Sequence, residues 1–225
     1  MIESSADLLL ALHKLRLIDD DRYPRWWRSY GTWATLPEAI LTQQTRWANV
    51  ERSMENLLKL GLDGIDKIAA ADRLTIARAI APSGFCNQKA MRIAALARQT
   101  LDEFGDFDNF ALKVDREWLL SRKGIGRESA DSILCYGCKR AVMVVDSYTA
   151  RLLGALGREF DEYDEIQRWL TFGVENEFDR VAKALRLDLE LTYAYFHGLI
   201  VEFSKAQKRG ETDISRLTQR SNLKL

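Results

Sequence analysis

Apolar residues recur at helical spacing along most of this chain. Where apolar positions return every three or four residues, the pattern predicts an amphipathic helix. We expect helices over residues 6–12, 36–41, 50–60, 93–104, 112–120, 128–138, 147–156, 163–172 and 188–205. Only three prolines occur, Pro24, Pro37 and Pro82. So few helix breakers in a long chain favour an all-α fold.

Two segments depart from this pattern. Residues 141–145 read Ala-Val-Met-Val-Val, and β-branched residues favour extended backbone. Because this run is short and lies between two predicted helices, we expect a buried connector rather than a strand of a sheet. Residues 208–225 are polar and charged, and we expect them to fray.

Composition and charge narrow the class of protein. The 225 residues are 47% hydrophobic and 29% charged, which suits one globular unit or two small lobes and excludes intrinsic disorder. Lys+Arg and Asp+Glu both total 33, so nucleic-acid binding would depend on local placement of charge. No apolar run reaches the length of a membrane span, and Met1 leads into an acidic segment rather than a signal peptide. Three cysteines suit a reducing compartment, so we expect a protein of the cytoplasm.

The most informative segment is residues 119–131, Leu-Leu-Ser-Arg-Lys-Gly-Ile-Gly-Arg-Glu-Ser-Ala-Asp. Gly124 and Gly126 permit a tight turn between two helices, and Ile125 between them would enter the core. The amides at the start of the second helix are suited to phosphate. A Gly-x-Gly turn usually only reverses the chain. Here, however, Asp146 follows in Val-Val-Asp-Ser-Tyr, and that combination is far more specific.

The combination resembles the helix-hairpin-helix DNA glycosylases of the endonuclease III superfamily, over about residues 26–205. Residues 41–45, Leu-Thr-Gln-Gln-Thr, resemble the helix start from which that superfamily inserts a glutamine into DNA. Residues 84–90, Gly-Phe-Cys-Asn-Gln-Lys-Ala, resemble the loop that carries its intercalating wedge. The resemblance implies two helical lobes around a DNA-binding cleft. Residues 31–140 would form a six-helix barrel with the hairpin, and residues 1–30 with 141–225 a second lobe that carries Asp146.

The resemblance also implies a catalytic role for Asp146. Its carboxylate would stabilise an oxocarbenium-like sugar and orient or deprotonate the attacking water. Asp146 could instead only cap the helix that begins at Ser147, since Asp is a favoured cap, and the two roles are compatible.

Further DNA contacts follow from the same resemblance. Gln44 would fill the space that a flipped base leaves, with Gln43 less suited, and Phe85 would wedge into the opposite strand. The amides of Gly124 and Gly126 would hold a phosphate, with a monovalent cation at the hairpin carbonyls when DNA is bound. Two charged side chains beside the turn would contact the DNA backbone or be solvated: Lys123 and Arg127.

Glu128 bears on whether the enzyme also cuts the strand. Bifunctional members of the superfamily carry a lysine at this position, and a carboxylate cannot form the Schiff base that strand cleavage needs. The resemblance therefore implies a monofunctional glycosylase, in which Glu128 either faces solvent or lines the base pocket.

Cofactors are not expected. No cysteine follows Cys138, which excludes the four-cysteine iron–sulfur cluster of endonuclease III. The spacing of Cys135 and Cys138 suits zinc, but a second ligand pair is lacking, so we interpret both as core residues and expect no metal site. His13 and His197 are isolated, and we interpret them as structural.

Tryptophans narrow the substrate. Trp26 and Trp27 are flanked by arginines, and Trp47 follows the glutamine motif. Aromatic residues in helical proteins are normally buried, but two adjacent tryptophans are hard to bury together. With Glu128 and no cluster, the pattern resembles the endonuclease-III-like bacterial 3-methyladenine DNA glycosylases, whose aromatic residues at these places form the base pocket. Arg28, where that group tends to have proline, and Trp47, where it has a smaller aromatic, put fine selectivity in doubt.

An alkylated base is cationic, and electron-rich indoles attract it by about 0.5–2 kcal/mol per good contact. Lys205 could end near the pocket, where a desolvated amine can react with carbon dioxide to give an anionic carbamate; the alternative is an ordinary surface lysine. The expected partner is double-stranded DNA with an alkylated base, bound by a monomer near the bacterial nucleoid. Two other functions stay open: a thymine or uracil mismatch glycosylase, and a non-catalytic DNA-binding module.

Overall fold

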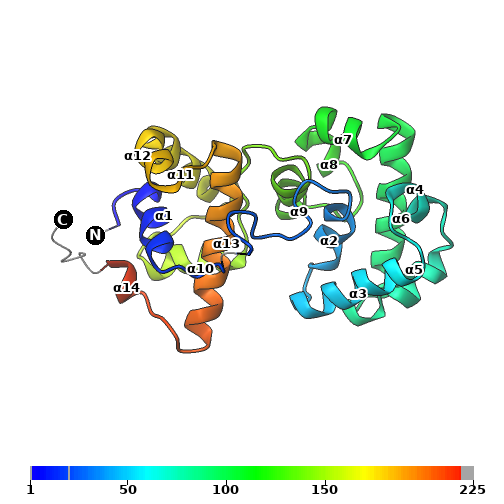
Figure 1. The fold of residues 1–225 in the computed structure, drawn as a ribbon, viewed down its shortest axis with the longest axis horizontal. Coiled ribbons are helices and arrows are strands. Elements are labelled where there is room, and N and C mark those ends of the chain that lie inside the picture. Colours follow the sequence, from blue (N-terminus) through cyan, green and yellow to red (C-terminus); the bar gives the residue numbers. More distant parts are fainter. Residues whose placement is uncertain (1, 20, 219–225) are drawn as a thin grey trace. The chain divides into compact units, whose positions relative to one another are not determined.

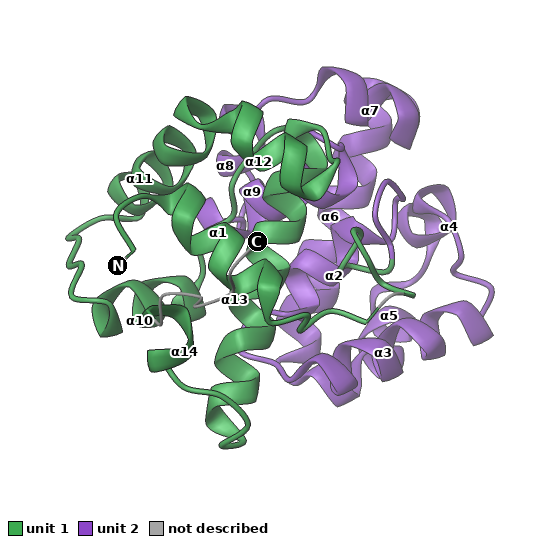
Figure 2. Cartoon of the chain, turned by 60° about the vertical axis from the view of Figure 1, so that its left-hand side comes forward, with its two compact units in different colours: residues 1–28, 141–225 green, residues 29–140 purple. Residues whose placement is uncertain are grey.

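The computed structural model describes residues 2–19 and 21–218, and this part of the chain is helical, without a β-strand (Figure 1). The chain divides into two compact units (Figure 2). Unit 1 comprises residues 1–28 and 141–225, and unit 2 comprises residues 29–140. No described helix is long and apolar enough to cross a membrane.

Unit 1 is built around its longest helix, α13. α1, α10 and α12 pack against it, and α1 also packs on α11. The apolar face of α1 enters the core through Leu8, Leu9 and Leu12. The helices of unit 1 are α1 (Ser5–Lys14), α10 (Ser147–Ala155), α11 (Tyr163–Asn176), α12 (Phe178–Leu185), α13 (Leu189–Lys208) and α14 (Ser215–Thr218).

Unit 2 is built around α6, against which α2, α4, α5 and α7 pack. The hairpin joins α8 to α9, and Arg116 holds the two helices together through a bidentate ion pair with the buried Asp131, at 2.7 and 2.9 Å. The helices of unit 2 are α2 (Thr35–Leu41), α3 (Trp47–Lys59), α4 (Ile65–Ala70), α5 (Arg73–Ala79), α6 (Cys86–Phe104), α7 (Phe107–Lys113), α8 (Arg116–Leu120) and α9 (Arg127–Ser132), with a 3-10 turn (Ala81–Ser83) and a π-helical turn (Ile133–Gly137).

The all-α prediction is confirmed, and so is the buried connector, because Met143, Val144 and Val145 are buried in a segment that is neither helix nor strand. The single helix expected over 112–120 is wrong. Asp115 caps a new helix by accepting a hydrogen bond from the Trp118 amide at 2.7 Å, and α7 and α8 are separate.

The expected fraying after residue 208 is wrong as far as residue 218. There α14 forms and buries Leu217 in the core of unit 1. Residues 219–225, which belong to the same prediction, lie outside the described residues.

Candidate active site

Asp146 lies at the N-cap of α10, directly after the buried connector. Its Oδ1 accepts hydrogen bonds from the amide of Thr149 at 2.8 Å and from the Thr149 hydroxyl at 2.9 Å. The capping interpretation is therefore correct, and it uses only one carboxylate oxygen. The second oxygen, Oδ2, lies 3.5 Å from Nε2 of His197.

His197 and Thr149 decide the charge of Asp146. Burial alone would raise the pKa of this carboxyl, whose side chain is only 12% exposed. The contact with His197 and the hydrogen bonds from Thr149 outweigh burial, and the net pKa of Asp146 is lowered. Asp146 is therefore a carboxylate at neutral pH. The interpretation of His197 as merely structural missed this contact, because no local pattern links His197 to Asp146.

Trp26, from the segment after α1, packs against His197 and its neighbours on α13. The indole of Trp26 meets the His197 ring edge-on at 5.6 Å between centroids. Its Nε1 donates a hydrogen bond to Glu202 at 2.9 Å. Gly198 permits this approach, because a Cβ there would lie 2.5 Å from the Trp26 ring. Unit 1 thus brings Trp26 beside the partner of Asp146, whereas Trp27 is buried at 5% exposure and meets Trp26 edge-on.

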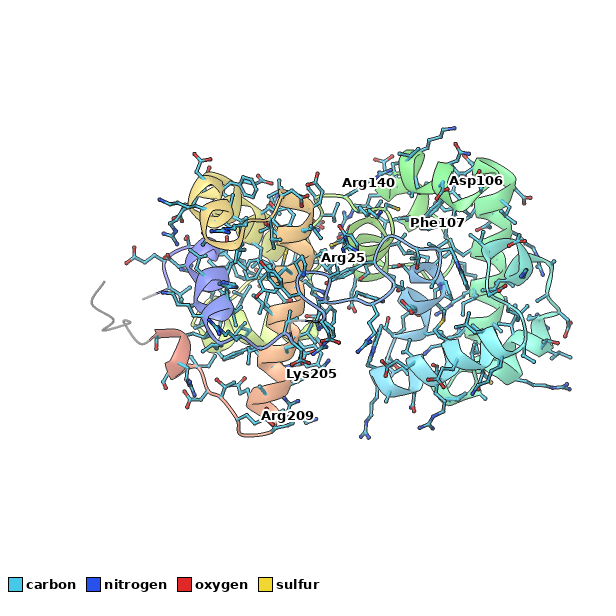
Figure 3. The ribbon with its side chains drawn as sticks, viewed as in Figure 1. Arg25, Asp106, Phe107, Arg140, Lys205 and Arg209 are labelled. Atoms are coloured by element: carbon cyan, nitrogen blue, oxygen red, sulfur yellow. The ribbon has the colours of Figure 1, made fainter. Side chains whose placement is uncertain are left out.

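Lys205 lies near the C-terminal end of α13 (Figure 3). Its ammonium is 3.2 Å from Glu202 and 5.5 Å from the centroid of the Trp26 ring, and its side chain is one-third exposed. These contacts suit a lysine ammonium, and a carbamate beside Glu202 would place two negative charges together. The carbamate stays a prediction. The contact with Trp26 indicates that this ring face accepts a cation.

The hairpin of unit 2 uses its two glycines differently. Gly124 has φ +86°, a left-handed conformation that favours glycine. Gly126 has ordinary extended backbone, and a Cβ there would meet nothing within 4 Å. Its own fold therefore does not require a glycine at 126, and the space it leaves lies at the N-terminus of α9. Ile125 is buried between them, as expected.

The adjacent glutamines also divide their roles. The amide nitrogen of Gln43 donates to the Gly124 carbonyl at 2.9 Å and to the Ser129 hydroxyl at 3.0 Å, and its oxygen accepts from Arg92 at 3.1 Å. Gln43 is thereby occupied in holding the hairpin. Gln44, by contrast, is exposed and has φ +53°.

Phe85 stands at the N-cap of α6 with φ +45° and is 68% exposed, an unusual state for a phenylalanine. The other candidates of unit 2 lie at the start of α3 and around the hairpin. Trp47 is the first residue of α3 and is half-buried, and Lys123, Arg127 and Glu128 are exposed around the hairpin.

The two later cysteines do not suit metal binding. Cys135 is buried and Cys138 half-buried in unit 2. Burial raises the pKa of the Cys138 thiol to about 12 and raises that of Cys135 as well, so both stay protonated, whereas metals bind thiolates. Among the described residues, no three His, Cys, Asp or Glu side chains gather as a ligand set.

Comparison with known proteins places this geometry among DNA repair enzymes. A family model described as HhH-GPD superfamily base excision DNA repair protein matches residues 38–175. The crystal structure of the H. pylori 3-methyladenine DNA glycosylase MagIII, bound to 1,N6-ethenoadenine, is 40% identical in sequence. The similarity covers 91% of this chain and 98% of that chain, with a TM-score of 0.87.

Two further similarities agree. The "Putative DNA repair glycosylase" of Methanocaldococcus jannaschii is 34% identical over 213 residues, which is 91% of this chain and 90% of that protein. A non-covalent endonuclease III–DNA complex is 19% identical with a TM-score of 0.57, over 75% of this chain and 71% of that chain, and shares the fold.

Proposed function

Because the chain belongs to the HhH-GPD superfamily and is a DNA glycosylase of base excision repair, we propose that it releases cationic, 3-methyladenine-type bases from double-stranded DNA and leaves the strand uncut. The observation that carries the reaction is the half-buried Asp146 carboxylate, whose pKa is lowered by His197 and Thr149.

The chemistry follows from that charge. Alkylation at a ring nitrogen makes the base a good leaving group, so the glycosidic bond breaks with positive charge growing on the sugar. A fixed carboxylate in a partly desolvated setting stabilises that charge and orients the water that attacks the sugar carbon. Unlike an aqueous anion, Asp146 is already held in place by two hydrogen bonds from Thr149.

Two observations support a cationic base as the substrate. The 40% identity with a 3-methyladenine DNA glycosylase extends over nearly the whole chain. Trp26, whose N–H is bonded to the Glu202 carboxylate, already has the Lys205 ammonium against its ring. Neutral adenine would gain less from such a ring and is a worse leaving group.

Glu128 supports a monofunctional reaction. It is exposed in the first turn of α9, at the position where bifunctional members of the superfamily have their lysine. Without an amine there, no Schiff base forms and the abasic product stays intact. We further propose that the enzyme acts as a monomer in the bacterial cytoplasm and needs no iron–sulfur cluster.

The test compares three duplex DNAs: methylated, deaminated and undamaged. Chromatography should identify 3-methyladenine as the released base from the first and no base from the other two. The product should be cut only after alkali, and borohydride should trap no protein–DNA adduct. Release of uracil or thymine would favour a mismatch glycosylase, efficient trapping would contradict the monofunctional assignment, and binding without release would indicate a DNA-binding module.

A further inference from the structure

Lys89, in the first turn of α6, is a buried lysine that the proposed reaction does not use. It is 2% exposed. Its ammonium shares its three N–H groups among four acceptors: the carbonyls of Leu41, Gln43 and Ser83, each at 2.9 Å, and the Thr45 hydroxyl at 2.7 Å. Three of these oxygens come from residues 41–46, which we call the Gln44 loop, and one comes from residues 81–85, which we call the Phe85 loop.

This burial is costly. Among the described residues, no carboxylate lies within ion-pair distance of Lys89, and Arg92 adds a second positive charge nearby. Burial, with some repulsion from Arg92, lowers the pKa of Lys89 to about 8. An apolar side chain of similar length would fill the same volume without desolvating a charge. A buried ammonium therefore needs a reason other than packing.

The two loops supply that reason, because each holds one residue in a disfavoured backbone conformation. Gln44 has φ +53° and Phe85 has φ +45°, in the left-handed region that non-glycine residues rarely adopt. Each is exposed, and each is next or nearly next to a residue whose carbonyl Lys89 binds, Gln43 and Ser83. Such conformations persist where the surroundings hold them, and they gather at functional sites.

We propose that Lys89 is a positioning residue that locks the Gln44 loop and the Phe85 loop to each other, so that both side chains enter DNA in a fixed relation. A hydrogen bond from the Thr45 hydroxyl to the Ser83 carbonyl, at 2.8 Å, is a second link between the same loops. This inference rests on the proposed function, since it assigns to the loops the task of extruding the base.

The test is a pair of variants on α6. Lys89→Met keeps the length of the side chain and removes its donors. Thr100→Val is the matched control, because Thr100 is fully buried on the same helix and its hydroxyl has no hydrogen-bond partner. Single-turnover release of 3-methyladenine is measured with thymine opposite the lesion and with a tetrahydrofuran abasic analogue opposite it, where extrusion is easier.

With thymine opposite, we expect Lys89→Met to slow release by about tenfold or more, and with the abasic analogue opposite by less than about threefold. Thr100→Val should match the parent on both DNAs. Equal slowing of Lys89→Met on both DNAs would reduce Lys89 to general support of the fold, and parental rates on both would overturn the inference. Thr45→Val, which removes one of the four oxygens, should show the same preference with a smaller effect.

Hydrogen exchange of the backbone amides, measured without DNA, tests whether Lys89 holds the two loops together independently of the reaction. Amides of both loops should exchange faster together in Lys89→Met, with the C-terminal half of α6 unchanged. Unchanged exchange in the loops would overturn the inference even if the enzyme has a different substrate. If the parent releases no methylated base at all, the proposed function fails, and the exchange data alone decide the role of Lys89.

Discussion

Each unit of this glycosylase has a charged side chain with little solvent exposure near the start of a helix, Asp146 in unit 1 and Lys89 in unit 2, and the two are held in opposite ways. In unit 1 the neighbouring side chains position the charged group: Thr149 and His197 contact the Asp146 carboxylate and lower its pKa. In unit 2 the charged group positions the backbone around it: the Lys89 ammonium donates hydrogen bonds to carbonyls of two loops. The comparison teaches that buried charge can serve reaction chemistry or backbone shape. Substitutions at four places in the two units would test whether that division is real.

The largest effect should come from Asp146→Asn. Asparagine is also a good N-cap, so α10 should persist while the negative charge is lost. Single-turnover release of 3-methyladenine should fall by about 10²–10⁴-fold, whereas affinity for duplex with an abasic analogue should stay close to that of the parent. Near-parental rates would mean that Asp146 is only a cap, and Glu128 would then be the first candidate for the catalytic carboxylate.

Next in size are Gln44→Ala and Phe85→Ala, which remove the exposed side chains of the unit 2 loops. Since extruding a base costs a few kcal/mol, each should slow release from intact duplex by about 10–100-fold. Gln43→Ala should behave differently and also weaken binding of undamaged DNA, because Gln43 holds the hairpin. The division fails if Gln44→Ala and Phe85→Ala slow release equally from single-stranded methylated DNA.

A smaller effect should come from Trp47→Leu, which retains bulk without the π face. If Trp47 attracts the cationic base, capture of 3-methyladenine should weaken by about 2–30-fold, the equivalent of about 0.5–2 kcal/mol. Binding of DNA that already carries an abasic site is the control and should not change. If the variant captures 3-methyladenine with the same affinity as the parent, Trp47 has no part in base recognition. Unit 2 would then contribute only to DNA binding and base extrusion.

The smallest change at neutral pH should come from His197→Phe. Without His197, only the hydrogen bonds from Thr149 oppose the effect of burial, which raises the pKa of Asp146. The parent carboxylate stays ionised below its ordinary pKa of 3.8, so its contribution to activity and stability is lost only as pH falls through that lowered value. In His197→Phe, the acid limb of the pH–rate profile should move to higher pH. An unchanged limb would show that Thr149 alone sets the charge.

The sequence predicts the long helices because their apolar periodicity is strong, as in α3 and α6. It also predicts the seven-residue α2, but it does not predict α4, α5 or α12. Asp72 was an available signal for α5, since its carboxylate accepts from the amides of Leu74 and Thr75 at its start.

At the candidate site, residues within motifs could be located from sequence, whereas contacts between distant segments could not. The exposed Gln44 and Phe85 agree with their expected roles, which stay predictions. The contact of His197 with Asp146 depends on how α13 packs beside α10, and no local pattern encodes that. Lys89 was missed for another reason: lysine is among the residues least often buried, so a sequence offers no cue that this one is.

The discontinuity of unit 1 has a consequence for synthesis on the ribosome. Unit 2 is one continuous stretch and can fold soon after it emerges, but α1 needs α11 and α13 to cover Leu8, Leu9 and Leu12. Roughly 175 residues separate α1 from α13, so at about 5–20 residues per second the apolar face of α1 waits about 10–35 seconds for its partners. During that interval the nascent chain exposes an apolar segment that chaperones can bind. Asp146 also lacks its contact with His197 until α13 has been synthesised.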